Sequence, residues 1–106
     1  MIRRTLPQRR ASETFDLRFW SQNFTVTVGF YPDGTPGEVF IDGGKTGQDI
    51  QSTARDAAVA LSLALQHGTP IEKIRHAVTR DGSGAAGSIL GAIIDAISIK
   101  TLAARP

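Results

Sequence analysis

The first half of the chain alternates between apolar and polar residues, the pattern typical of half-buried β-strands. Residues 14–19 and 23–31 both place an apolar side chain at every second position, with Tyr31 assigned to the outer face. A third strand is expected over residues 38–42. The connections between them, WSQN and PDGTPG, are short and rich in turn-forming residues. The pattern therefore predicts an antiparallel meander of three strands.

The second half changes to a helical period. Apolar residues recur every three or four positions from about Gln48 to His67, and Gly68 follows as a C-terminal stop. Thr69–Glu72 has the form of a helix start, with Thr as N-cap and Pro in the first turn, for a helix ending near residue 79. A third helix is expected over about residues 88–103. The predicted fold class is α+β: a three-stranded antiparallel sheet followed by three helices packed on one face.

The glycine-rich stretch IDGGKTGQDI, residues 41–50, contains the Gly-Lys-Thr that ends a phosphate-binding P-loop. A P-loop would need glycine at position 39, where the sequence has Val39. Thr46 and Asp49 instead have the spacing of a helix cap, so the stretch is interpreted as a strand end, a turn and a helix start. A weak anion site at the turn remains an alternative, with these residues: Gly43, Gly44, Lys45 and Thr46.

Charge is unevenly distributed along the chain. The formal net charge is +2, but the first ten residues hold four of the 12 basic residues and none of the 10 acidic ones, so residues 11–106 carry −2. We therefore divide the chain into a basic N-terminal arm, residues 1–10, and a single domain, residues 11–106. The arm contacts nucleic-acid phosphates, is a solvated terminus, or pairs with the domain's own carboxylates. Its four basic residues are Arg3, Arg4, Arg9 and Arg10.

Several kinds of chemistry find no support in the sequence. The chain has no cysteine, which excludes disulfides and thiolate chemistry, and it has no apolar run long enough to span a membrane. His67 and His76 lack a third ligand for zinc, and Ser62 lacks the turn that presents a nucleophile. Glu38 and Asp42 share one face of a strand without a catalytic partner. We expect a cytoplasmic protein with no catalytic residues, no bound metal and no cofactor.

The predicted third helix is apolar around most of its circumference, relieved mainly by Asp95 and Lys100. Such a helix must be covered on several sides. It is either the central element of the chain's own core or part of a contact with a second chain. We favour a homodimer in which this C-terminal helix lies at or beside the two-fold interface.

Four separated stretches resemble the TSCPD domain family: LPQRRASETFDLRF, VTVGFYPDGTPGEVFIDGGKTGQD, ALSLALQHGTPIEKIRHAV, and the closing glycine-serine loop with its apolar helix. The most specific parts are Gly37–Ile41 with Gly44–Gly47, and Leu61–Leu65 with Gly68. The resemblance covers about residues 6–95. TSCPD domains occur at the C-terminal end of vitamin B12-dependent ribonucleotide reductases and as small stand-alone bacterial proteins.

The chain departs from the family at its name-giving Thr-Ser-Cys-Pro-Asp signature. The corresponding loop is placed at residues 81–87, where the sequence has neither Cys nor Pro. The resemblance also implies no reductase activity for this chain, because the radical-generating and cobalamin-binding parts of the reductase lie in other domains. We therefore expect a non-catalytic binding or regulatory module that self-associates. The alternative is a nucleotide or nucleic-acid binder that uses the arginine arm and the Gly43–Gly47 turn.

Overall fold

The computed structural model describes residues 2–44 and 49–104, with side chains as far as Ser98. The elements follow the expected order, and the α+β class is confirmed. Three strands come first and three helices follow: β1 Ser12–Phe19, β2 Gln22–Phe30, β3 Pro36–Gly43, α1 Asp49–Gln66, α2 Ile71–Ala77 and α3 Ile89–Ala104. No helix in the described part of the chain combines the length and apolar character needed to cross a membrane.

The sheet is an antiparallel meander in the order β1-β2-β3. A two-residue turn joins β1 to β2, and both of its residues, Trp20 and Ser21, have positive φ angles of 50° and 62°. This is the geometry of the tight hairpin turns that match the strand twist. The turn before β3 is closed by Asp33, whose carboxylate accepts hydrogen bonds from the backbone N–H and the hydroxyl of Thr35.

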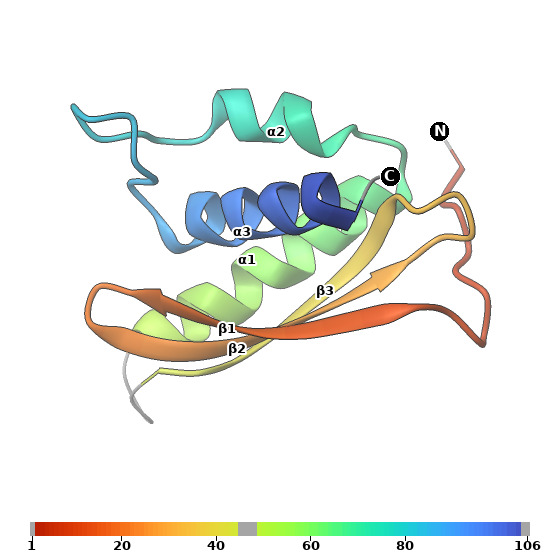
Figure 1. The fold of residues 1–106 in the computed structure, drawn as a ribbon, viewed down its shortest axis with the longest axis horizontal. Helices are drawn as coiled ribbons and strands as arrows, with labels where there is room; N and C mark the ends of the chain where they lie inside the picture. The colour runs from red at the N-terminus through yellow and green to blue at the C-terminus, as the bar shows by residue number, and fades with distance from the viewer. Residues whose placement is uncertain (1, 45–48, 105–106) are drawn as a thin grey trace.

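The helices form two layers above one face of the sheet (Figure 1). α1 packs against β3, α3 packs against α1 and β1, and α2 packs against α3. The core lies between the sheet and the first helix layer. It consists of these buried residues: Phe24, Val26, Val28, Val39, Ile41, Ala54, Ala58, Leu61, Leu65, Ile89, Ile93, Ile94 and Ile97.

Helix α3 is the central element of this core over its described side chains. Ile93, Ile94 and Ile97 are at most 1% exposed within a single chain. Two explanations were open for the apolar circumference of this helix. The burial of its residues up to Ser98 agrees with the first, a position in the chain's own core. The side chains of Ile99, Lys100 and Leu102 lie outside the described ones.

Two local predictions were wrong. Tyr31 was placed on the outer face, but it follows the end of β2 and is only 4% exposed, because it covers the end of the sheet. Thr69 was expected to cap α2, yet the N-cap is Pro70 and no side chain caps the helix. The stop at Gly68 is confirmed. Gly68 has a φ of 93°, and the amides of Gly68 and Thr69 donate to the carbonyls of Leu65 and Ala64.

The outer edge of β3 is covered by polar side chains from α1. The Ser62 hydroxyl accepts from the Val39 amide at 2.8 Å and lies 3.2 Å from the Val39 carbonyl. One turn later, Gln66 donates from Nε2 to the Gly37 carbonyl at 2.9 Å. Backbone groups that an edge strand normally leaves open are therefore satisfied within the chain. Ser62 has a structural role here.

Candidate functional site

The N-terminal arm lies against the end of the domain instead of extending into solvent. The Arg4 amide donates to the Gln66 carbonyl at 2.7 Å, and Arg3 Nε donates to Gln66 Oε1 at 2.5 Å. Tyr31 fixes the same segment, since its hydroxyl donates to the Arg4 carbonyl at 2.8 Å. The Arg4 guanidinium in turn lies 3.8 Å above the Tyr31 ring, within cation–π range.

Gln66 joins the arm, the sheet and α1, a role that the sequence analysis did not predict. Its side chain is 5% exposed, and both ends of its amide are used: the oxygen by Arg3 and the nitrogen by the Gly37 carbonyl. Buried amides without partners are costly, so these bonds explain how a polar residue is accommodated there. One feature of the sequence could have indicated this role: Gln66 follows Ser62 by four residues and so lies on the same face of the helix.

The second half of the arm is held by one ion pair. Arg10 Nε lies 2.6 Å from Glu38 Oε1, and its Nη1 donates to the Pro7 carbonyl. The Glu38 side chain lies across Gly29, where any Cβ would be 2.5 Å from Oε1. Arg9 is exposed and forms no ion pair or hydrogen bond within the described residues. Three of the four arm arginines therefore interact with the domain itself.

A hollow of about 350 Å³ opens where the arm, the turn before β3 and the α1–α2 connection meet. Its charged lining residues are Arg4, Asp33 and Glu72. Arg4 and Asp33 form an ion pair at 3.2 Å, and both side chains are about half exposed. Hydrogen bonds from Thr35 and, less strongly, the charge of Arg4 lower the pKa of Asp33. With one cation and two carboxylates, the hollow is not a cationic phosphate site.

The two halves of the proposed nucleotide site lie far apart. The arm is at the Pro36 end of β3, whereas Gly43 and Gly44 are at the other end, roughly 25 Å away for an eight-residue strand. Figure 1 shows the described part of the arm and the Gly43 end of β3 at opposite sides of the molecule. Lys45 and Thr46 lie outside the described residues. The Gly44 amide already donates to the Asn23 carbonyl at 2.9 Å, so it is not directed at a ligand.

The other polar residues singled out from the sequence are dispersed. His67 Nδ1 is 2.8 Å from the Leu63 carbonyl, and His76 is exposed on α2. Asp42 pairs with Arg55 at 3.1 Å on the surface. Among residues 2–44 and 49–104, no three His, Cys, Asp or Glu side chains are grouped closely enough to hold a metal ion.

A cluster of charged residues that the sequence analysis did not predict connects α2, the following loop and α3. Arg80 donates to both carboxylate oxygens of Asp95, with Nη2 at 2.8 Å from Oδ1. Arg75 adds a second ion pair to Asp95 at 3.4 Å and a third to Glu72 at 3.2 Å. The Arg80 hydrogen bonds lower the pKa of Asp95, and the charges of Arg80 and Arg75 act in the same direction.

The loop at residues 81–87, where the family signature was placed, forms a compact turn. The Asp81 carboxylate accepts from the Ser83 amide at 2.8 Å, the Ser83 hydroxyl at 2.7 Å and the Ala85 amide at 3.1 Å. The bonds from Ser83 are the main cause of the lowered pKa of Asp81. The turn is therefore built by a carboxylate in a sequence that has no cysteine.

Acid should destabilise the protein partly through Asp95. A carboxylate whose pKa is lowered on folding stabilises the native state above its unfolded value, 3.8 for Asp, and this contribution is lost as pH falls through the native value. We expect the urea midpoint to fall below about pH 4 and the Asp95→Asn variant to lose part of that dependence. Asp56→Asn, which removes an exposed carboxylate of α1, should keep the wild-type slope. Equal slopes for all three proteins would contradict the assignment.

The fold and the interactions of the arm define a small α+β domain with its N-terminal segment docked on it. The sequence model of the TSCPD domain matches residues 2–100, and the chain belongs to this family. The chain is 40% identical over 72 residues to a vitamin B12-dependent ribonucleotide reductase of Rhodopirellula baltica, which covers 68% of this chain and 7% of that protein. It is 35% identical over 99 residues to the enzyme of the same name from Agrobacterium fabrum, covering 92% of this chain and 8% of the relative.

A third bacterial relative, from Bradyrhizobium diazoefficiens, has the same name and is 34% identical over 89 residues, covering 84% of this chain and 7% of that protein. The chain thus spans less than a tenth of the length of these relatives. No solved structure matches it significantly. The family resemblance inferred from the quoted motifs is confirmed.

Proposed function

We propose that this TSCPD domain is a non-catalytic binding or regulatory module, related to the corresponding region of ribonucleotide reductases, and that it self-associates. One observation carries the proposal: the charged groups near its hollow and in its loops interact with one another and maintain the fold. Arg4 pairs with Asp33, Arg10 with Glu38, and Arg80 with Asp95. Acid–base catalysis needs a titratable group directed at a substrate, and these pairs are directed at each other.

The relatives support a module more than an enzyme. They are named as reductases, but the part that they share with this chain is at most 12% of their length. We propose that this chain acts in the cytoplasm through protein contacts, the first being with a second copy of itself. An assay with a ribonucleotide, adenosylcobalamin and a dithiol reductant should then yield no deoxyribonucleotide from the purified chain. Sustained turnover would contradict the proposal.

Nucleotide binding is the competing function, and it can be tested directly. Calorimetric titration with ATP, dATP and single-stranded DNA should show no micromolar binding, because the arm and the glycine turn do not form one site. Micromolar nucleotide affinity that Lys45→Ala abolishes would favour the competing function.

Arg9→Ala is the better arm variant for the DNA experiment. Deleting residues 1–10 would also remove the contacts of Arg3 and Arg4 with Gln66, whereas Arg9 has no partner within the described residues. Salt-dependent DNA binding that this variant weakens would show that the arm contacts phosphates.

A further inference from the structure

The two edges of the sheet differ in how they are protected. The β3 edge is covered by Ser62 and Gln66 of α1. Among the described strands, β1 is hydrogen-bonded to β2 alone, and its residues 12–14, 16 and 18 are exposed. β1 runs across the front of Figure 1, and none of the described helices lies over its outer edge. It contains neither proline nor lysine, and its pairing with β2 has no bulge, so several of the features that usually block a sheet edge are missing. Its charged side chains are Glu13, Asp16 and Arg18.

At the even-numbered residues of β1, the backbone amide and carbonyl groups point outward, away from β2. Phe30 donates its amide to the Ala11 carbonyl, so this odd-numbered residue is bonded toward β2. Asn23, which faces Arg18 across the ladder, directs its carbonyl to the Gly44 amide, and so toward β3. Bonded and non-bonded pairs alternate along an antiparallel ladder. The backbone amides and carbonyls of Asp16 and Arg18 therefore face away from β2.

We propose that a second copy of this chain pairs antiparallel along β1, with Leu17 at the two-fold axis, to give a continuous six-stranded sheet. This inference rests on the self-association proposed above and identifies its surface. In this register, Asp16 of each copy lies directly opposite Arg18 of the other, twice by symmetry. Opposite charges that face each other across strands stabilise the pairing, and like charges destabilise it.

The charges distinguish this register from its neighbours. Opposed residues in an antiparallel pair lie on the same face of the sheet, so the two-fold axis must pass through a residue of β1. An axis through Asp16 would place two carboxylates opposite each other. With an axis through Phe15, the Asp16 side chains of the two copies would be diagonal neighbours. Glu13 of each copy would then lie opposite Leu17 of the other. Only the axis through Leu17 opposes each Asp16 carboxylate to a guanidinium.

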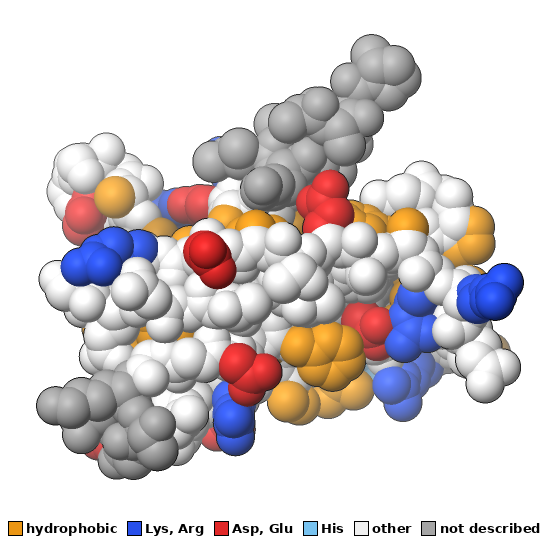
Figure 2. All heavy atoms as spheres, turned by 60° about the horizontal axis from the view of Figure 1, so that its bottom comes forward, with side chains coloured by type: hydrophobic (Ala, Val, Ile, Leu, Met, Phe, Trp, Pro, Cys, Tyr) orange, Lys and Arg blue, Asp and Glu red, His pale blue; other side chains and the backbone are white. Residues whose placement is uncertain are grey.

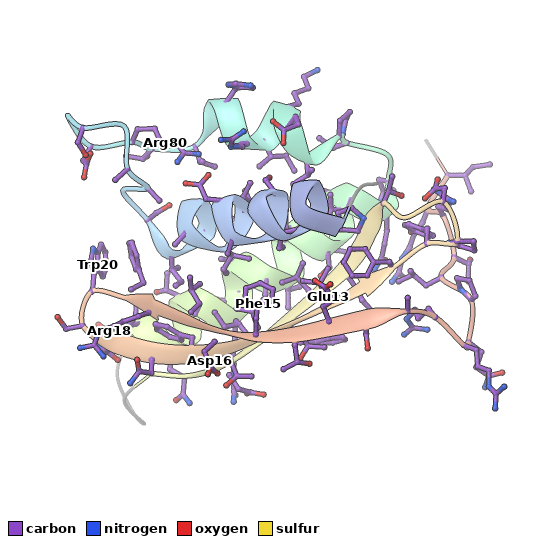
Figure 3. All side chains as sticks on the ribbon, in the orientation of Figure 1. Glu13, Phe15, Asp16, Arg18, Trp20 and Arg80 are labelled. Carbon is purple, nitrogen blue, oxygen red and sulfur yellow. The ribbon has the colours of Figure 1, made fainter. Side chains whose placement is uncertain are left out.

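The apolar residues on the other face fit the same arrangement. Phe15, Leu17 and Phe19 are half-buried against the core at the sheet's edge. In the proposed register Leu17 meets Leu17 of the second copy, and Phe15 meets Phe19 of the second copy. Figure 3 shows Phe15 on the helix side of β1 and Asp16 on the opposite side. Helix α3 packs on β1, so the pairing would place it beside the two-fold axis.

Charge exchange at two residues gives the decisive experiment. Asp16→Arg and Arg18→Asp each convert both opposite-charge pairs into like-charge pairs, so each variant alone should dimerise at least about tenfold more weakly than wild type. The two variants mixed should form a heterodimer, because the two basic side chains of one chain then face the two acidic side chains of the other. The double variant should recover the wild-type affinity. Asp56→Arg, an equal charge change on α1, should leave dimerisation unchanged. Native mass spectrometry distinguishes all these species.

Hydrogen exchange supplies a second measurement on the unaltered protein. The amides of Asp16 and Arg18 should become more protected as protein concentration rises, while those of the covered β3 edge should not change. A wild-type dimer whose single variants stay fully dimeric and whose Asp16 amide is never protected would overturn this surface but keep self-association. A wild-type protein that remains a monomer throughout would overturn both. Single variants that fail to fold would leave the exchange measurement to decide.

Discussion

Replacing Ile97 by Asp should unfold the chain. Ile97 is 1% exposed and lies in the core formed by the sheet, α1 and α3. A carboxylate there would lose its hydration without gaining a partner, and we expect the free energy of unfolding to fall by more than about 4 kcal/mol. That exceeds much of the stability of a typical small domain. Circular dichroism with urea denaturation measures the effect.

Ile97→Val is the matched control, since it removes one methylene from the same position. It should cost only about 1 kcal/mol and leave the fold and the mass in solution unchanged. The competing explanation of the apolar helix makes a different prediction. If Ile97 lay at a contact between two chains, Ile97→Asp would yield a folded monomer, and that result would contradict the burial of α3 within one chain.

Gly43→Ala should be the most damaging change in the glycine turn. Gly43 has a φ of 109°, and a Cβ added there would lie 2.6 Å from the Asn23 carbonyl oxygen, a backbone atom that cannot move aside without breaking the sheet. Strained backbone and overpacking each cost about 1–3 kcal/mol, so we expect a loss of roughly 3 kcal/mol. Thermal or urea unfolding measures this loss.

Two other glycines allow the cost of backbone strain to be measured apart from the cost of the close contact. Gly34 has a φ of 87° but open space around it, so Gly34→Ala should show the backbone penalty alone, about 1 kcal/mol. Gly82 has neither a positive φ nor a close neighbour, and Gly82→Ala should change stability by less than about 0.5 kcal/mol. Equal effects at Gly43 and Gly34 would mean that the contact with Asn23 is not the reason for glycine in the turn.

The periodicity of the sequence was sufficient for the order and type of the elements. Apolar residues at every second position in β1 and β2 and at every third or fourth in α1 face the core, as predicted. Tyr31 was misplaced because alternation was extended past the end of the strand, where the chain turns and the ring covers the sheet's end. Thr69 was misassigned because its spacing fits a capping box, although the helix begins one residue later.

The candidate site was less accessible from the sequence, because it depends on contacts between distant residues. Charge counting found the arginine arm and allowed three outcomes, but it could not show that Arg3 and Arg4 meet Gln66, or that Arg10 meets Glu38. These contacts join residues 28 or more positions apart. The acidic and basic side chains visible in Figure 2 are interspersed on the face shown, which is not the basic stripe typical of nucleic-acid binding.

The β1 edge illustrates the same limit in another way. The strand pattern predicted β1, but only the three-dimensional structure shows that no further described strand or helix covers its outer edge. Once the edge is known, the sequence becomes informative again, since Asp16 and Arg18 are two positions apart on one face. That spacing allows a strand to pair with itself through opposite charges.

Self-association is best tested by the mass of the unaltered protein in solution. Light scattering coupled to size-exclusion chromatography should give twice the chain mass of 11.3 kDa across the micromolar range. A self-associating module predicts that value and a shift toward the single-chain mass on dilution. A mass of 11.3 kDa at every concentration would contradict self-association and the β1 surface proposed for it.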